Sequence, residues 1–158
     1  MGEAAERAAV VAQARRWIST EYHHNAAVHG AGIDCARIMI ETFADAGLID
    51  AFVPDDYPPD WHMHRGEERY LAVVESYCRL VDEDFRPIAL RSEYWSAAPG
   101  DVLMWRWGRT YSHSAIVTDW PNVVHAFAPE GMVVETNVRS YIKLAERPCR
   151  VYSFWKGK

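Results

Sequence analysis

A cysteine that follows a glycine-rich turn is the residue in this chain best placed to do chemistry. Gly30 and Gly32 allow a tight turn before Cys35, and Asp34 can cap a helix that begins there. In the first turn of a helix, the backbone N–H groups and the helix dipole favour negative charge. We therefore expect the Cys35 thiol to ionise readily and to act as a nucleophile if a base lies within reach.

Two histidines late in the chain, His113 and His125, are the expected source of that base. If the hairpin between their strands turns near Trp120, His125 lies opposite Ala115. The two histidines are then diagonal neighbours on one face of the sheet, whereas a turn displaced by one residue would separate them. In the first geometry His113 would accept the proton of Cys35, and His125 would orient the His113 ring.

Covalent hydrolysis of an amide is the chemistry that these three residues would perform. Attack by the thiolate creates an oxyanion, which backbone N–H groups at the start of the helix can stabilise. His113 would then protonate the leaving amine and activate the water that cleaves the thioester. A single cysteine in a helix or histidine in a strand is more often structural, so the prediction depends on the three occurring together.

The remaining histidines could be interpreted as ligands of a metal ion. His23, His24 and His29 lie close together in the sequence, and His62 and His64 flank one methionine. No acidic or cysteine partner has ligand spacing with them, so we interpret them as loop histidines. We expect neither a metal nor a cofactor.

Composition and charge exclude several classes of function. The 158 residues carry a formal net charge of −5 without a run of lysine or arginine, which argues against nucleic-acid binding. Cys35, Cys78 and Cys149 have irregular spacing, which argues against a disulfide framework and indicates a reducing cytosol. We also expect no signal peptide, no membrane insertion and a single domain spanning residues 1–158.

Hydrophobic periodicity predicts three helices in the first half of the chain. The first covers residues 3–18, the second runs from Asp34 to a left-handed cap at Gly47, and the third covers residues 67–81. The third helix places Cys78 on its apolar stripe, so we expect that thiol to be a core residue. Prolines and aspartates in residues 50–66 predict a long surface loop that serves as a lid or a docking surface.

Short runs of β-branched and aromatic residues, separated by turns, follow Pro87. They cover residues 102–107, 113–119, 123–128, 132–136 and 150–155. Such runs predict an antiparallel sheet, and helices followed by strands are typical of the α+β class.

Four motifs in order resemble those of the NlpC-type cell-wall cysteine peptidases, a papain-like family. They are Gly32-Ile33-Asp34-Cys35, Pro99-Gly100-Asp101-Val102-Leu103, Ser112-His113-Ser114-Ala115-Ile116-Val117 and Val123-Val124-His125-Ala126. Residues 17–35 and the loop from Tyr57 to Trp61 are most similar to the branch encoded among bacteriophage tail genes and gene transfer agents. The resemblance implies a papain-like α+β fold, with N-terminal helices packed on a five- or six-stranded antiparallel sheet.

The resemblance also assigns roles to individual residues. In such a protein Cys35 is the nucleophile, His113 the base and His125 the orienting residue. Tyr22 and Asp34 shape the oxyanion and substrate-amine side of the cleft, which His24 is expected to border. The expected substrate-binding residues are therefore Tyr22, Asp34 and His24.

The implied activity is hydrolysis of peptidoglycan stem peptides. Such an enzyme would be made in the cytoplasm, join other phage tail proteins in a virion tail, and act on the host wall in the periplasm. Members of this family often have Ser-Gly directly after the cysteine, where this chain has Ala36-Arg37. The resemblance therefore implies the loss of a hydroxyl contact to substrate and leaves open which peptide bond is cleaved. Two alternatives remain: a structural tail module that docks through residues 50–66, and a thiol acyltransferase.

Overall fold

The alanine-rich N-terminal segment folds as helix α1 (Glu3–Arg16) in a computed structural model of the protein, which describes residues 2–54 and 69–156. Val10 and Ala14 are buried, as the helical pattern predicts. Trp17 takes the C-cap position and is also buried. The predicted helix extended to Ile18, but this residue is 37% exposed because the chain has already left the helix at Arg16.

Helix α2 (Cys35–Asp45) begins where the capping residue predicts. The Asp34 carboxylate accepts hydrogen bonds from the backbone N–H groups of Ala36 and Arg37, at 3.1 and 2.9 Å. Gly47 follows the helix with a φ of 74°, which confirms the predicted left-handed stop. Six residues of α2 are buried, so it is a central helix of the fold.

Helix α4 (Arg69–Tyr77) is shorter than the helix predicted for residues 67–81. Residues 67 and 68 lie outside the described part of the chain. At the other end, Arg79–Leu80 form strand β3 and pair with Ser153 and Tyr152, so sheet hydrogen bonds replace helical ones. Of the predicted loop over residues 50–66, residues 51–54 contain neither helix nor strand, and residues 55–66 are outside the described part.

The predicted antiparallel sheet is confirmed, and the described residues contribute six strands to it. The longer strands are β4 (Val102–Trp107), β5 (Thr110–Asp119), β6 (Asn122–Phe127), β7 (Met132–Asn137) and β8 (Cys149–Ser153). Their spatial order is β3-β8-β4-β5-β6-β7, which places β5 near the middle of the sheet. A separate two-stranded sheet pairs β1 (Ala27–Val28) with β2 (Gly32–Ile33).

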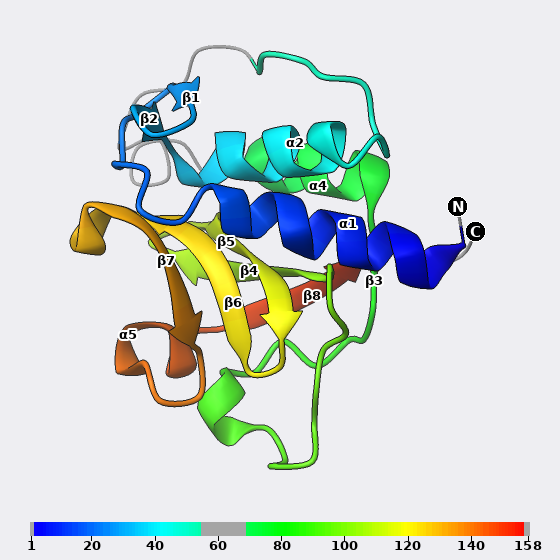
Figure 1. The fold of residues 1–158 in the computed structure, drawn as a ribbon. Helices are drawn as coiled ribbons and strands as arrows, with labels where there is room; N and C mark the ends of the chain where they lie inside the picture. Colours follow the sequence, from blue (N-terminus) through cyan, green and yellow to red (C-terminus); the bar gives the residue numbers. More distant parts are fainter. Residues whose placement is uncertain (1, 55–68, 157–158) are drawn as a thin grey trace.

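The two faces of the large sheet pack against different parts of the chain (Figure 1). Helices α1, α2 and α4 cover one face, which we call the helix face. The short helix α5 (Ile142–Ala145), which the sequence pattern did not predict, lies on the other side, which we call the far face. Strand residues buried on the helix face include Met104, Ile116 and Val124. Those buried on the far face include Leu103, Trp105, Ala115 and Phe127.

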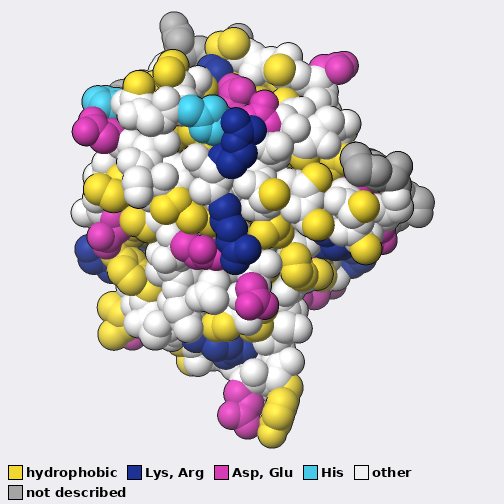
Figure 2. Space-filling model, in the orientation of Figure 1, with side chains coloured by type: hydrophobic (Ala, Val, Ile, Leu, Met, Phe, Trp, Pro, Cys, Tyr) yellow, Lys and Arg dark blue, Asp and Glu magenta, His cyan; other side chains and the backbone are white. Residues whose placement is uncertain are grey.

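Acidic and basic side chains are interspersed on the surface drawn in Figure 2. Histidine side chains reach this surface at the upper left, where Figure 1 places β1 and β2. Within residues 2–54 and 69–156, the helices are too short or too polar to cross a membrane.

Candidate active site

The thiol of Cys35 lies at the first position of α2, beside Ser112 near the start of β5. Its S–H donates to the backbone carbonyl of Ser112, with sulfur and oxygen 3.6 Å apart. The Tyr22 hydroxyl donates a hydrogen bond to the sulfur, and the backbone N–H groups of Cys35 and Ala36 also interact with it. The helix start therefore surrounds the sulfur with donors, as the sequence predicts.

The expectation that this thiol ionises readily is wrong for the structure as it stands. Burial raises the pKa of Cys35 to about 12, and the negative charge of Asp34 raises it further. The three hydrogen-bond donors act in the opposite direction, but they are outweighed. The free-energy cost of desolvating a thiolate is larger than the stabilisation that the helix start provides. The thiol is therefore protonated at neutral pH.

The backbone carbonyl of Cys35 is held by two hydroxyl groups. Tyr70 of α4 donates to it at 3.1 Å and Ser114 of β5 at 2.9 Å, and the two hydroxyl oxygens are 2.6 Å apart. These bonds join the nucleophile turn to a second helix and to the sheet. Sequence analysis did not find Tyr70 or Ser114, because each occupies an ordinary position of its helix or strand and carries no motif of its own.

Asp34 has a larger structural role than the sequence suggested. Its side chain is 1% exposed, and besides capping α2 it accepts a hydrogen bond from the backbone N–H of Asn25 at 2.7 Å. His24 lies beside the same carboxylate, with Nδ1 and Oδ2 3.7 Å apart. The carboxylate therefore fixes residues 24–25 to the start of α2.

Replacing Asp34 with alanine is expected to lower the free energy of unfolding by about 1–2 kcal/mol, because the helix cap is lost. Asp34→Asn is the matched control, since asparagine also caps helices well. Urea unfolding followed by circular dichroism measures both variants. Equal stability of Asp34→Ala and the unmodified protein would contradict the structural role.

His113 and His125 meet as the hairpin argument predicts. Strand β5 pairs with β6 through Ile116 and Val124, the neighbours of Ala115 and His125, and the Nε2 of His113 lies 2.9 Å from the Nδ1 of His125. The other ring nitrogen of His125 lies 2.8 Å from the hydroxyl of Thr136. Burial holds the pKa of His113 well below its usual value, with a further contribution from His125. Burial alone lowers the pKa of His125 to about 4.

The rings of these two histidines pack on the far face of the sheet. The His113 ring packs against Trp105, Trp107 and Phe127 on the far face. Ser114, the next residue, points to the helix face and bonds the Cys35 carbonyl. Because successive side chains of a strand alternate between faces, His113 must point away from the helices. The sulfur of Cys35 nevertheless lies against the backbone carbonyl of Ser112, the residue before His113. The expected contact between the thiol and the His113 imidazole, and a catalytic role for His113, stay predictions.

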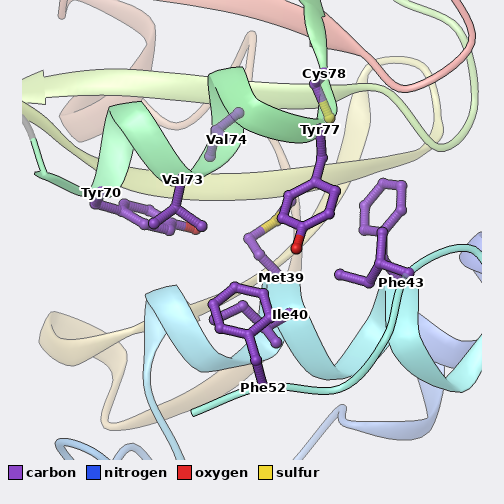
Figure 3. A pocket seen from close by; sticks show the side chains of 10 residues that line it. Met39, Ile40, Phe43, Phe52, Tyr70, Val73, Val74, Tyr77 and Cys78 are labelled. Atoms are coloured by element: carbon purple, nitrogen blue, oxygen red, sulfur yellow. The ribbon is translucent and has the colours of Figure 1, made fainter. Parts of the chain in front are cut away.

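An apolar pocket lies behind the nucleophile turn, between α2 and α4 (Figure 3). Met39, Ile40 and Phe43 line it from α2, and Tyr70 lines it from α4. Cys78 lies at its edge and is 5% exposed, which confirms the prediction that this thiol is a core residue. Cys35 does not line this pocket, so it is not the reaction cleft.

The loop histidines form no evident metal centre in the part of the chain that the structure describes, since no three potential ligands converge there. His29 stacks on Trp17, with ring centroids 3.4 Å apart, and His23 pairs with Glu21. His62 and His64 are outside the described residues.

No protein-family profile and no curated protein matches the sequence. Solved structures do match its fold. The chain is similar to NlpC1 from Trichomonas vaginalis (TM-score 0.61, 14% identity), with 96% of this chain and 44% of that one covered. It is similar to the NlpC/p60 domain of the peptidoglycan hydrolase SagA (TM-score 0.57, 19% identity), with 92% and 97% covered. It is also similar to the peptidoglycan hydrolase RipB from Mycobacterium tuberculosis (TM-score 0.56, 16% identity), with 98% and 68% covered.

The fold is therefore that of NlpC/P60 domains, a papain-like arrangement of helices on an antiparallel sheet. The chain spans less than half of the Trichomonas protein, but nearly the whole of the SagA domain. A shared fold does not by itself transfer an activity, so function has to be argued from the site.

Proposed function

We propose that this protein is a cell-wall hydrolase, a cysteine endopeptidase that cleaves peptidoglycan stem peptides with Cys35 as its nucleophile. The observation that carries the proposal is the position of Cys35. Its sulfur lies at the first turn of a capped, central helix and accepts hydrogen bonds from Tyr22 and from two backbone N–H groups. Those N–H groups would stabilise the oxyanion formed on attack.

The protonated state of the thiol shapes the mechanism that we propose. Because the pKa of Cys35 is raised, the sulfur must give up its proton as it attacks the substrate carbonyl. An imidazole has to accept that proton and return it to the leaving amine. We propose His113 for this role, because the sulfur lies against the carbonyl of the preceding residue, Ser112, and His125 contacts the His113 ring.

Product analysis tests the activity directly. The purified protein is incubated with peptidoglycan sacculi or a stem tetrapeptide, and the products are analysed by mass spectrometry. We expect shorter peptides with a free carboxylate at the cleaved bond, which is the product of thioester hydrolysis. A new acyl conjugate would indicate an acyltransferase instead, and unchanged substrate would contradict the proposal.

The second candidate function is a structural module with the same fold and no hydrolase activity. The raised pKa of Cys35 and the lowered pKa of His113 favour it, because both side chains are then neutral rather than a thiolate and an imidazolium. In this case unchanged substrate would accompany normal assembly with a partner after Cys35→Ala.

We propose delivery by a phage or phage-like tail, with other tail proteins as partners. The resemblance of residues 17–35 to the tail-associated branch supports this. Co-purification of the protein with assembled tail particles is the measurement that checks it.

A further inference from the structure

The carbonyl oxygen of Cys35 has more hydrogen-bond donors around it than its helix requires. A carbonyl in the first turn of a helix accepts one backbone N–H, from the residue four positions later. Here the hydroxyl oxygens of Tyr70 and Ser114 also lie 3.1 and 2.9 Å from the carbonyl oxygen. Tyr70 belongs to α4 and Ser114 to β5. The hydroxyl pair is therefore additional to the hydrogen bonds that form α2.

The two hydroxyl groups also contact each other. Their oxygens are 2.6 Å apart, at the short end of the range for hydroxyl hydrogen bonds. Two protons are therefore available for three contacts. In every arrangement in which both protons form hydrogen bonds within this group, the Cys35 carbonyl accepts at least one of them. A hydroxyl that accepts a hydrogen bond becomes a stronger donor itself, so the pair donates more strongly than either member alone.

Burial increases the importance of this hydroxyl pair. Tyr70 is 6% exposed and Ser114 is completely buried, so solvent does not replace a donor that is lost there. Burial also raises the pKa of Tyr70 well above its usual value, and the neighbouring titratable groups Cys35, Asp34 and Cys78 raise it further. Tyr70 therefore keeps its proton at neutral pH and remains a donor.

The peptide group that accepts these hydrogen bonds also faces the nucleophile. Its N–H belongs to Ala36 and interacts with the sulfur of Cys35. The same nitrogen lies 3.1 Å from a carboxylate oxygen of Asp34, so the sulfur and the carboxylate share one donor. Tyr22 is a further titratable group in contact with the sulfur. A hydrogen bond to the oxygen of a peptide group polarises it, so its N–H becomes a stronger donor at the other end.

We propose that Tyr70 and Ser114 are positioning residues for the nucleophile. By holding the Cys35 carbonyl, they direct and strengthen the Ala36 N–H that faces the sulfur. This rests on the proposed hydrolase function. Negative charge develops on the sulfur as it loses its proton and on the substrate oxygen as the carbonyl is attacked. A stronger N–H donor therefore stabilises the transition state more than the bound substrate.

The test compares Tyr70→Phe, Ser114→Ala and the double variant with the unmodified protein in the full chain. Each single variant keeps one hydroxyl within reach of the Cys35 carbonyl, and the double variant keeps neither. Tyr77→Phe is the matched control, because Tyr77 lies on the same helix and lines the same apolar pocket (Figure 3). Thermal unfolding of each variant sets a temperature at which all of them are folded.

Two readouts separate positioning of the nucleophile from a purely structural role. The first is kcat and KM for hydrolysis of the stem tetrapeptide. The second is the rate at which iodoacetamide alkylates Cys35 between pH 6 and pH 10, which peptide mass spectrometry separates from alkylation of Cys78 and Cys149. A loss of packing alone would lower the unfolding temperature without changing either readout in the folded protein.

We expect the double variant to lower kcat by about tenfold or more and to keep KM within about twofold, because the weakened donor acts on the transition state. Alkylation of Cys35 at a given pH should be about threefold slower or more, since the thiolate loses part of its stabilisation. Each single variant should lie between the double variant and the unmodified protein. Tyr77→Phe should match the unmodified protein in both readouts.

Other results would overturn the proposal in distinguishable ways. If the folded double variant matches Tyr77→Phe in kcat and in alkylation, the hydroxyl pair is structural only. If KM rises while kcat and alkylation are unchanged, the pair acts on substrate binding and not on the nucleophile. If no form of the protein hydrolyses the peptide, the proposed function fails. The alkylation rates then decide alone: slower alkylation in the double variant supports an effect on the thiol, and equal rates contradict it.

Discussion

Replacing Cys35 with alanine is expected to lower the rate of stem-peptide hydrolysis by about 1,000-fold or more, because no other group in the nucleophile turn can form the thioester. Cys78→Ala is the matched control. It also removes a thiol, but from the apolar pocket between α2 and α4 rather than from the nucleophile turn. The measurement is the rate of product formation under identical conditions, with thermal unfolding as a check on folding.

The control variant separates a chemical effect from a structural one. Cys78→Ala should lose some stability, since it leaves a small cavity, but it should keep its activity at a temperature where it is folded. If Cys35→Ala hydrolyses the peptide as fast as Cys78→Ala does, the nucleophile has been assigned incorrectly. A Cys35→Ser variant adds a further comparison, because its hydroxyl is a poorer nucleophile of similar shape.

Local rules were sufficient for the parts of the site that lie close together in the sequence. Asp34 was recognisable as a helix cap, and it binds the N–H groups of Ala36 and Arg37 as such caps do. The contact between His113 and His125 followed from the position of one turn, because register in a hairpin fixes which side chains face each other. Each of these predictions needed only a few residues of context.

The relation between Cys35 and His113 needed information that the local pattern does not contain. Because side chains alternate along a strand, Ser114 and His113 must point to opposite faces of the sheet. The alternation does not indicate which of these faces the helices cover. The structure answers this through Ser114, whose hydroxyl bonds the Cys35 carbonyl. A shift of one residue in this assignment would exchange every side chain of the strand between the two faces, so the sequence pattern alone leaves it open.

The ionisation of the thiol was mispredicted for a similar reason. A helix start is a local feature, whereas burial depends on how the sheet, α2 and α4 pack together. The second effect is larger here, and it raises the pKa of Cys35 to about 12. Strand β3 likewise forms at residues 79–80 because β8 offers an edge, which no helical pattern can indicate.

Acidification is expected to destabilise the fold well above the pH at which most carboxylates titrate. In the folded protein burial lowers the pKa of His125 to about 4, whereas an unfolded chain gives histidine a value near 6.5. Below pH 6.5 the unfolded chain therefore binds a proton that the folded chain excludes. The stabilising contribution is complete above that pH and is lost as the pH falls from 6.5 through about 4.

The size of this effect follows from the displacement of the pKa, since each unit corresponds to about 1.4 kcal/mol. His125 alone is expected to reduce the free energy of unfolding by about 3 kcal/mol between pH 7 and pH 4. His113, whose pKa is also lowered by burial, acts in the same direction. Urea unfolding at a series of pH values measures the loss.

His125→Gln separates this histidine from the carboxylates that titrate at lower pH. Glutamine can still bond the hydroxyl of Thr136 but cannot take up a proton, so the slope of stability against pH between 6.5 and 4 should become shallower. His23→Gln removes an exposed histidine outside this buried pair and is the matched control. An equal slope in all three proteins would mean that the histidines on the far face of β5 are accessible to protons in the folded state.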